Sequence, residues 1–249
     1  MYRAFTPPAI AELLGIDLEA DHPVGLILHG CYDMPAATQR WRDRLANARV
    51  ARKAFNVVIG RHGDATVWYV PVLGAPLAAF AVHGACALGA RSVVQIGSFG
   101  STRRNLEVGD LLLVTGAGRG DAVSDWYLPA GEPATADESL NERVRAALRA
   151  RGVPWHEGTV FTTPAFLAET WDDVVRWEAE GYAGVEMEAA TTFAVAKHFG
   201  VPAVALIYLL DNLIAERHLL DNTLPERERV QQARELVQEI ALQVVTGAA

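Results

Sequence analysis

The chain is poor in cysteine and carries no metal-binding pattern. Only Cys31 and Cys86 occur among its 249 residues, too few for a disulfide framework. Its seven histidines are scattered, with neither HExxH nor Cys-x-x-Cys spacing, so the sequence predicts no metal site. These absences favour a reducing compartment, and we expect a cytoplasmic protein.

Long hydrophobic runs and an excess of basic residues are also lacking. The longest apolar runs, such as Val201–Leu210, have the length of a strand and fall far below the ~20 residues of a membrane span. The first residues, MYRAFTPPAIAELLG, lack the basic and then apolar pattern of a signal peptide. With a net charge of −8 and a pI near 5.4, the chain is not expected to bind nucleic acid or a membrane surface. A small molecule is the expected partner.

What is present is an alternation of strand-like and helix-like segments, without internal repeats. The strand-like runs are mostly continuous, which is typical of strands buried on both faces in α/β folds. They lie at Gly25–His29, Ala54–Ile59, Ala65–Val72, Ser92–Ile96, Asp110–Val114, Thr159–Phe161, Gly184–Met187 and Val201–Leu210. We therefore predict the α/β class, with a single domain over residues 1–249 and a central mixed sheet flanked by helices.

Helix signals separate these strands. Ala75–Leu88 is small and apolar throughout, and Ala136–Arg151 follows a capping box at Thr135–Glu138. A second capping box, at Thr223–Glu226, opens the last helix. The segment 116–133 is too long and too rich in Gly and Pro for a simple connector, so it is either a functional loop or a surface excursion.

Polar residues stand where several predicted strands end. These positions are His29–Asp33, Gly97–Ser101, Glu186–Glu188 and Asp211–Asn212. Each has an ordinary explanation: Glu188 can stabilise a helix start, Glu186 can lie on a solvated face, and Asp211 can cap a turn. Because ligands of open α/β sheets bind beyond the strand ends, their coincidence favours one polar cleft.

The motifs resemble those of the nucleoside phosphorylase family, which includes hexameric purine nucleoside phosphorylase, uridine phosphorylase and the methylthioadenosine/adenosylhomocysteine nucleosidases. The most specific motif is GVEMEAA at 184–190. The others are Gly30 at a strand end, Gly74-Ala75-Pro76 before a helix, Gly97-Ser98-x-Gly100, Val108-Gly109-Asp110, 124–129 (SDWYLP) and Asp211. The resemblance covers nearly the whole chain and implies the fold of that family.

The resemblance also implies roles for individual residues. Glu188 matches the glutamate that grips the ribose hydroxyls, and Met187 matches the methionine that packs on the sugar. Phe166 matches the aromatic residue that stacks on the base. Asp211 matches the acid that protonates a purine ring nitrogen, a role that requires a raised pKa, and Arg227 matches the basic residue that poises it. Glu186 belongs to the motif, but its side chain has no assigned partner.

The phosphate end of the pattern is altered. The phosphorylases place one arginine a few residues after the glycine matching Gly30, where this chain has Met34. A second arginine stands two residues before the Gly-Ser turn, where this chain has Gln95. A third comes from a neighbouring subunit and is matched by Arg52. Ser98 is retained. Arginine suits a phosphate dianion because its donors are bidentate.

Three functions are consistent with these residues. A phosphorylase of purine-like nucleosides would hold phosphate with Ser98, Arg52 and one of Arg103 and Arg104. A nucleosidase would use water instead, with Asp33 as its base, although Asp33 equally suits an N-cap for a helix at 35–47. A non-catalytic member would bind a nucleoside without turnover.

The base and the assembly are likewise expectations from the resemblance. The stretch from Thr159 to Gly181 lacks the insertion with which uridine phosphorylases read uracil, which favours a purine. Family members share active sites across subunit pairs, so a homo-oligomer, a dimer or a trimer of dimers, is expected. No metal or organic cofactor is implied, and phosphate would be a co-substrate.

Overall fold

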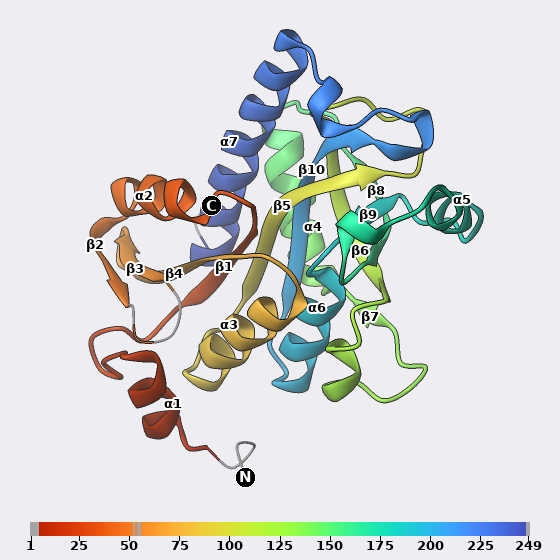
Figure 1. Cartoon of the computed structure of the whole chain (residues 1–249). Helices are drawn as coiled ribbons and strands as arrows, with labels where there is room; N and C mark the ends of the chain where they lie inside the picture. Colours follow the sequence, from red (N-terminus) through yellow and green to blue (C-terminus); the bar gives the residue numbers. More distant parts are fainter. Residues whose placement is uncertain (1–4, 52, 54–55, 248–249) are drawn as a thin grey trace.

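The central feature of the molecule is one mixed sheet with helices on both faces (Figure 1). The computed structural model describes residues 5–51, 53 and 56–247. The strands are β1 Gly25–Gly30, β2 Ala46–Ala51, β3 Val57–His62, β4 Ala65–Val72, β5 Val93–Ser101, β6 Leu111–Arg119, β7 Ala134–Thr135, β8 His156–Thr162, β9 Gly184–Glu186 and β10 Ala203–Asn212. The helices are α1 Pro7–Leu14, α2 Met34–Arg44, α3 Ala75–Ala87, α4 Glu138–Ala150, α5 Trp171–Ala179, α6 Ala189–His198 and α7 Leu224–Thr246. The predicted α/β class and mixed sheet are confirmed.

The sheet closes partly on itself. Its strand order is β2-β3-β4-β1-β5-β9-β8-β6-β10, β7 pairs with β6, and β10 pairs additionally with β5. Strands β5, β9, β8, β6 and β10 therefore form a ring, while β1 to β4 extend from it on the β1 side of β5. Because β1, β5 and β10 are parallel neighbours, their carboxyl ends lie at the same edge. Glu186 of β9 reaches this edge because β9 crosses the end of β5 in the antiparallel direction.

Two apolar layers bury the two faces of the sheet. One layer contains α1, α3 and α6, and the other contains α2, α4 and α7. Helix α6 is buried on all sides from Ala189 to Ala196, as its uninterrupted small and apolar sequence requires. It packs against α3 and against β6, β7 and β10, so its N-terminus is held beside the end of β9.

Helix boundaries follow the capping signals with one correction. The box at Thr223–Glu226 opens α7 as predicted. The box predicted at Thr135 was wrong, because Thr135 pairs with β6 as part of β7, and Asp137 caps α4 instead by accepting from the Leu140 N–H. Part of the strand predicted at Ala54–Ile59 lies outside the described residues, and β3 runs from Val57 to His62.

The segment 116–133 is ordered around one buried guanidinium. Arg119, at the end of β6, donates to the carbonyl oxygens of Leu128, Pro129 and Glu132 and pairs with Asp125. Its side chain is only 12% exposed. Residues 116–119 thus belong to β6 rather than to the predicted loop, and the rest of the segment is a loop held by Arg119. No helix among the described residues is long and apolar enough to cross a membrane.

The burial of α6 gives a test of the core. Phe193 is 1% exposed, and we expect Phe193→Ala to lower the free energy of unfolding by about 3–5 kcal/mol, because the cavity left behind cannot collapse fully. Urea unfolding followed by circular dichroism measures this change. Lys197→Ala is the matched control on the same helix, since its ion pair with Glu132 is solvent-exposed and should contribute less than about 1 kcal/mol. Equal losses for both variants would contradict the packing described.

Candidate active site

A large cavity lies at the ends of β1, β5, β9 and β10. Its volume is about 700 Å³. The segments 163–174 and 210–220 complete its wall, and both come from the top right of the molecule in Figure 1. Seven of the sequence-predicted residues line it: Gly30, Ser98, Phe166, Glu186, Met187, Glu188 and Asp211. Residues separated by up to 181 positions in the chain are thus brought to one place.

Glu188 is clamped between two backbone segments. Its Oε1 accepts a hydrogen bond of 2.6 Å from the Gly74 N–H. Gly74 has a φ of +86°, which favours glycine, and it directly precedes α3. On the other side, a Cβ added at Gly30 would lie 2.5 Å from Glu188 Oε2. Only a glycine at position 30 leaves room for this carboxylate.

The environment of Glu188 disfavours its charge in the absence of a ligand. The residue is 5% exposed. Burial, and then the neighbouring Glu186 carboxylate, raise its pKa to about 8 against the opposing effect of the Gly74 N–H. Hydrogen-bond donors from a bound ligand would favour the ionised form, so this group is suited to binding hydroxyl groups.

Glu186 is a structural carboxylate. It is 5% exposed, so the solvated-face interpretation was wrong. Its Oε2 accepts from the backbone N–H groups of Glu188 and Ala189 at 2.8 and 2.7 Å, at the start of α6. Gln95 Nε2 donates to the same oxygen at 2.9 Å, and the Thr162 hydroxyl donates to Oε1. Burial raises the pKa of Glu186, and these four donors oppose that rise.

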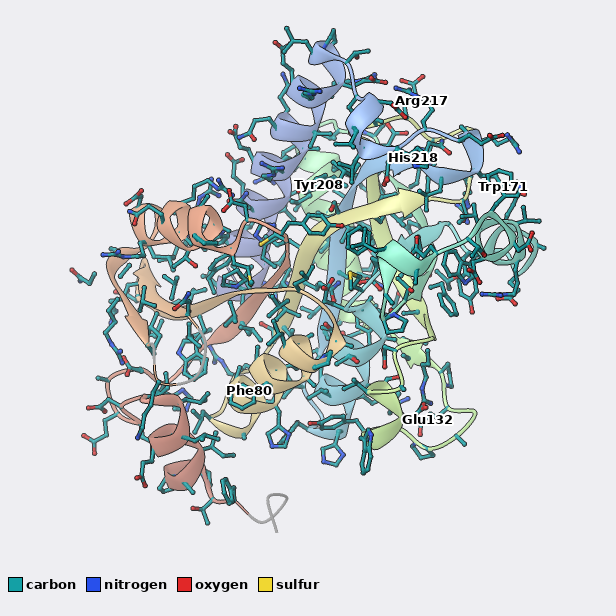
Figure 2. The ribbon with its side chains drawn as sticks, viewed as in Figure 1. Phe80, Glu132, Trp171, Tyr208, Arg217 and His218 are labelled. Carbon is teal, nitrogen blue, oxygen red and sulfur yellow. The ribbon has the colours of Figure 1, made fainter. Side chains whose placement is uncertain are left out.

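Asp211 stands at the other end of the cavity, near the end of β10. Burial raises its pKa to about 6, whereas the nearby His218 and the Leu219 N–H oppose the rise. Figure 2 shows His218 on the segment after β10, at the same end of the molecule as Trp171 of α5. A carboxyl group with this pKa holds a proton in part of the population near neutral pH and can donate it.

Aromatic rings line the space between these acids. Phe166 lies in a short 3-10 turn, Phe166–Ala168, and its ring centroid is 5.5 Å from that of Tyr32. The two rings are inclined at 55°. Tyr32 follows β1, and its pKa is raised to about 12 by burial and then by the Asp211, Glu188 and Glu169 carboxylates. The cavity therefore combines aromatic side chains with carboxylates, a combination suited to a ligand with a planar ring and a polyhydroxyl part.

Comparison with known proteins identifies the family of this chain. The model of the phosphorylase superfamily matches residues 26–246. The chain belongs to the phosphorylase superfamily.

Similar proteins in this superfamily carry several names. A protein of Halorubrum lacusprofundi named guanosine phosphorylase is 32% identical over 161 residues, covering 63% of this chain and 66% of the relative. A purine nucleoside phosphorylase of Hahella chejuensis is 36% identical, covering 63% and 64%. A uridine phosphorylase of Thermococcus kodakarensis is 27% identical, covering 57% and 56%. The matched regions thus span between 56% and 66% of the length of these relatives.

A crystal structure of uridine phosphorylase from Vibrio fischeri has the same fold. It superposes with a TM-score of 0.81 and covers 99% of this chain and 100% of the other. The sequence identity is 20%. At that level the likeness concerns the fold alone.

Of the described residues, those that match or could replace the phosphate arginines lie outside the cavity wall. Gln95 is 1% exposed and lies behind Glu186 rather than in the cavity wall. Gly97 pairs with Gly30 one residue before Ser98 and is likewise absent from the wall. Arg103 donates to the Glu157 carbonyl oxygen at 3.3 Å. Arg104 is exposed outside the wall, and Arg52 lies outside the described residues.

Two residues with expected catalytic roles also lie elsewhere. Asp33 caps α2, its Oδ1 accepting from the Ala36 N–H at 3.1 Å, and it does not line the cavity. Arg227, on α7, donates from Nε to the Asn222 carbonyl oxygen at 3.0 Å. The positively charged group that acts on Asp211 in its place is His218, when protonated.

The described wall of the cavity is acidic. Five carboxylate residues line it: Glu169, Glu186, Glu188, Asp211 and Glu216. No lysine or arginine is among the described residues that line it. Sequence reasoning missed Glu169 and His218, since neither stands at a predicted strand end, and it named Gly74 only within a motif, without a role for its N–H. Glu169 could have been suspected from its place three residues after Phe166.

The contact between Gly30 and Glu188 can be tested by adding one methyl group. Gly30→Ala keeps an allowed strand conformation but forces the Glu188 carboxylate aside, so we expect a roughly 10–100-fold loss of nucleoside affinity or turnover with little change in unfolding temperature. Ligand-binding calorimetry and thermal unfolding measure the two effects. In a Glu188→Gln background, Gly30→Ala should cause little further loss of affinity or turnover. If the losses caused by the two substitutions add in full, the clash between the two residues is contradicted.

Proposed function

We propose that this protein cleaves the N-glycosidic bond of a nucleoside by phosphorolysis, releasing the base and a ribose 1-phosphate. The observation that carries the proposal is the pair of carboxyl groups, Glu188 and Asp211, facing one cavity with the Phe166 ring. Relatives named guanosine, purine nucleoside and uridine phosphorylase support the reaction class. In this reaction the two acids need opposite protonation states.

Glu188 would bind the sugar in its ionised form. Two ribose hydroxyls would donate to its oxygens and supply the partners that a buried carboxylate requires. Positive charge develops on the ribose as the bond to the base lengthens, and an adjacent carboxylate stabilises that charge. Met187, whose Cε lies 3.7 Å from the position of a Cβ at Gly74, closes the apolar side of the sugar position.

Asp211 would act as the general acid. The base leaves with the electron pair of the C1′–N bond, takes the Asp211 proton on a ring nitrogen, and a phosphate oxygen forms the new bond to C1′. The proton balance is then restored from solvent. A purine is the proposed base, because the chain between Phe166 and Glu188 lacks the insertion that uridine phosphorylases carry.

Hydrolysis is the second candidate, and the acidic wall favours it. Arginine or lysine is the usual partner of a phosphate dianion, and neither lines the cavity in the described part of the chain. Water would replace phosphate, and the products would be the base and free ribose. Arg52, which lies outside the described residues, would supply a cation to the site of a second copy if the expected homo-oligomer forms.

Base release with and without phosphate distinguishes these functions. We expect a panel of nucleosides, followed by chromatography, to show purine release that depends on phosphate and yields ribose 1-phosphate. Undiminished release in phosphate-free buffer would establish hydrolysis instead. Nucleoside binding by calorimetry without any product would establish a non-catalytic role.

Glu188→Gln tests the sugar site through activity and stability together. We expect loss of turnover by about 10²–10⁴-fold, because an amide cannot stabilise the developing positive charge. The folded pKa of Glu188, about 8, lies above the ordinary value of 4.5. The folded state then binds the extra proton between these values, so the ligand-free protein loses stability as the pH rises through this range.

Glu188→Gln removes this loss of stability at high pH, because the amide does not titrate. The unfolding temperature of Glu188→Gln should therefore exceed that of the unaltered protein by a few degrees at about pH 8.5, and by less at about pH 5. Differential scanning calorimetry at both pH values measures the difference. A variant that is less stable at high pH, or that turns over normally, would contradict this placement of Glu188.

Asp211→Asn tests the general acid. Because the pKa of Asp211 is about 6, its protonated fraction falls tenfold per unit above that pH. We expect kcat to decline above about pH 6, and the variant to be roughly 10²–10⁴-fold slower with this decline abolished. Rates in saturating nucleoside across the pH range provide the measurement. Persistence of the alkaline decline in Asp211→Asn would assign the acid to another group.

A further inference from the structure

One acid of the cavity has no role in the reaction as described. Glu169 ends the 3-10 turn that carries Phe166, and it lines the cavity together with Asp211. Its Oε1 is buried and accepts no hydrogen bond from any described residue. A buried carboxylate oxygen without a donor is unfavourable by about 1–3 kcal/mol or more. The missing donor is therefore expected to come from a ligand.

The charged groups that act on Glu169 offer no donor. The charged groups that act on it are Asp211 of β10 and Asp173 of α5, both acids. Tyr32, across the cavity, responds in turn to the Glu169 charge. Burial and then these two acids raise the pKa of Glu169 to about 7. A ligand N–H at this position would relieve both the unsatisfied oxygen and the repulsion between carboxylates.

The order of groups along the cavity indicates which part of a nucleoside lies there. Glu188 is at the sugar end, and Phe166, the proposed base platform, precedes Glu169 by three residues. Asp211, the proposed proton donor to a ring nitrogen, is close enough to Glu169 to raise its pKa. The group beside the protonated ring nitrogen of a purine is its 6-substituent, which is an amino donor in adenine and a carbonyl acceptor in guanine and hypoxanthine.

We infer that Glu169 determines the specificity for the base, its ionised carboxylate accepting a hydrogen bond from the exocyclic amino group of a 6-aminopurine while Asp211 donates to the adjacent ring nitrogen. The inference rests on the proposed function, because it places the base by that reaction. A 6-oxopurine would present a carbonyl oxygen to the same carboxylate, and two acceptors repel. Adenosine is then preferred over inosine whenever Glu169 is ionised.

The preference depends on pH. Below about pH 7 the protonated Glu169 donates to a 6-carbonyl group, and above it the carboxylate accepts from a 6-amino group. The ratio of kcat/KM for adenosine to that for inosine should therefore rise as the pH increases from about 6 to about 8. Because both substrates share the sugar and the Asp211 step, the ratio cancels the titration of Glu188, Asp211 and His218.

The experiment compares this ratio in three proteins at about pH 8. In Glu169→Gln the ratio should fall roughly 10–100-fold, because the charge-assisted bond is lost and the amide can donate to a carbonyl. The pH dependence of the ratio should vanish as well. Asp172→Asn is the matched control: it removes the same charge three residues further on, outside the cavity wall, and should leave the ratio unchanged.

The outcomes separate this inference from the proposed function. A ratio that is the same in Glu169→Gln and in the unaltered protein, with both nucleosides cleaved, would overturn the role of Glu169 alone. If no nucleoside is cleaved, the proposed function fails, and calorimetry with free adenine and hypoxanthine replaces the rate measurement. Weaker adenine binding by Glu169→Gln, with unchanged hypoxanthine binding, would still support base recognition by Glu169, and equal binding would overturn it.

Discussion

A single buried carboxylate connects the parts of the structure that form the site. Glu186 accepts two backbone hydrogen bonds at the start of α6, one from Gln95 of β5 and one from Thr162 of β8. Three strands and a helix are thereby held at one point. A helix N-terminus favours an anion, so the charge of Glu186 is stabilised where solvent is excluded. Removing any one donor would leave a buried charge less satisfied, which is costly.

This anchor determines where the ligand-facing residues stand. Because Glu186 fixes the first turn of α6, Glu188 has a defined backbone position and its side chain reaches between Gly30 and Gly74. The turn from strand to helix explains the motif: Glu186 ends β9 and accepts from the start of α6, whereas Glu188 stands at the N-cap of α6 and its carboxylate lies beside Gly30 and Gly74. The pair therefore divides into a structural acid and a ligand-binding acid, although both are equally buried.

Much of this could be predicted from the sequence. Continuous apolar runs located β1, β4, β5 and β10, because strands buried on both faces leave that pattern. The partners of Glu186 could not be predicted, since Gln95 and Thr162 are 91 and 24 residues away and meet it only when β5 and β8 flank β9. The ring closure by β10 and β5 is likewise a tertiary property. Local capping rules failed at Thr135 because pairing with β6 outweighed them.

The site residues, too, divide into those that the sequence could predict and those that it could not. Glu188 and Asp211 stand at strand ends, where the α/β topology alone predicts polar function. Asp33 shows the limit of that rule. It also follows a strand, but its side chain caps the helix that begins next to it. Arg227 shows another limit, since a guanidinium on a long side chain takes the closest carbonyl oxygen that the fold offers, here that of Asn222.

The electrostatics of the cavity suggest how opposite protonation states are kept in a small volume. Glu188 is buried and Asp211 is partly buried, and both have raised pKa values. The two acids differ in their hydrogen-bond partners. Glu188 has room to accept from two ligand hydroxyls, whereas Asp211 already accepts from the Leu219 N–H and faces a ring. A bound ribose would lower the pKa of Glu188 and leave that of Asp211 high. The substrate itself would then complete the charge arrangement that the reaction requires.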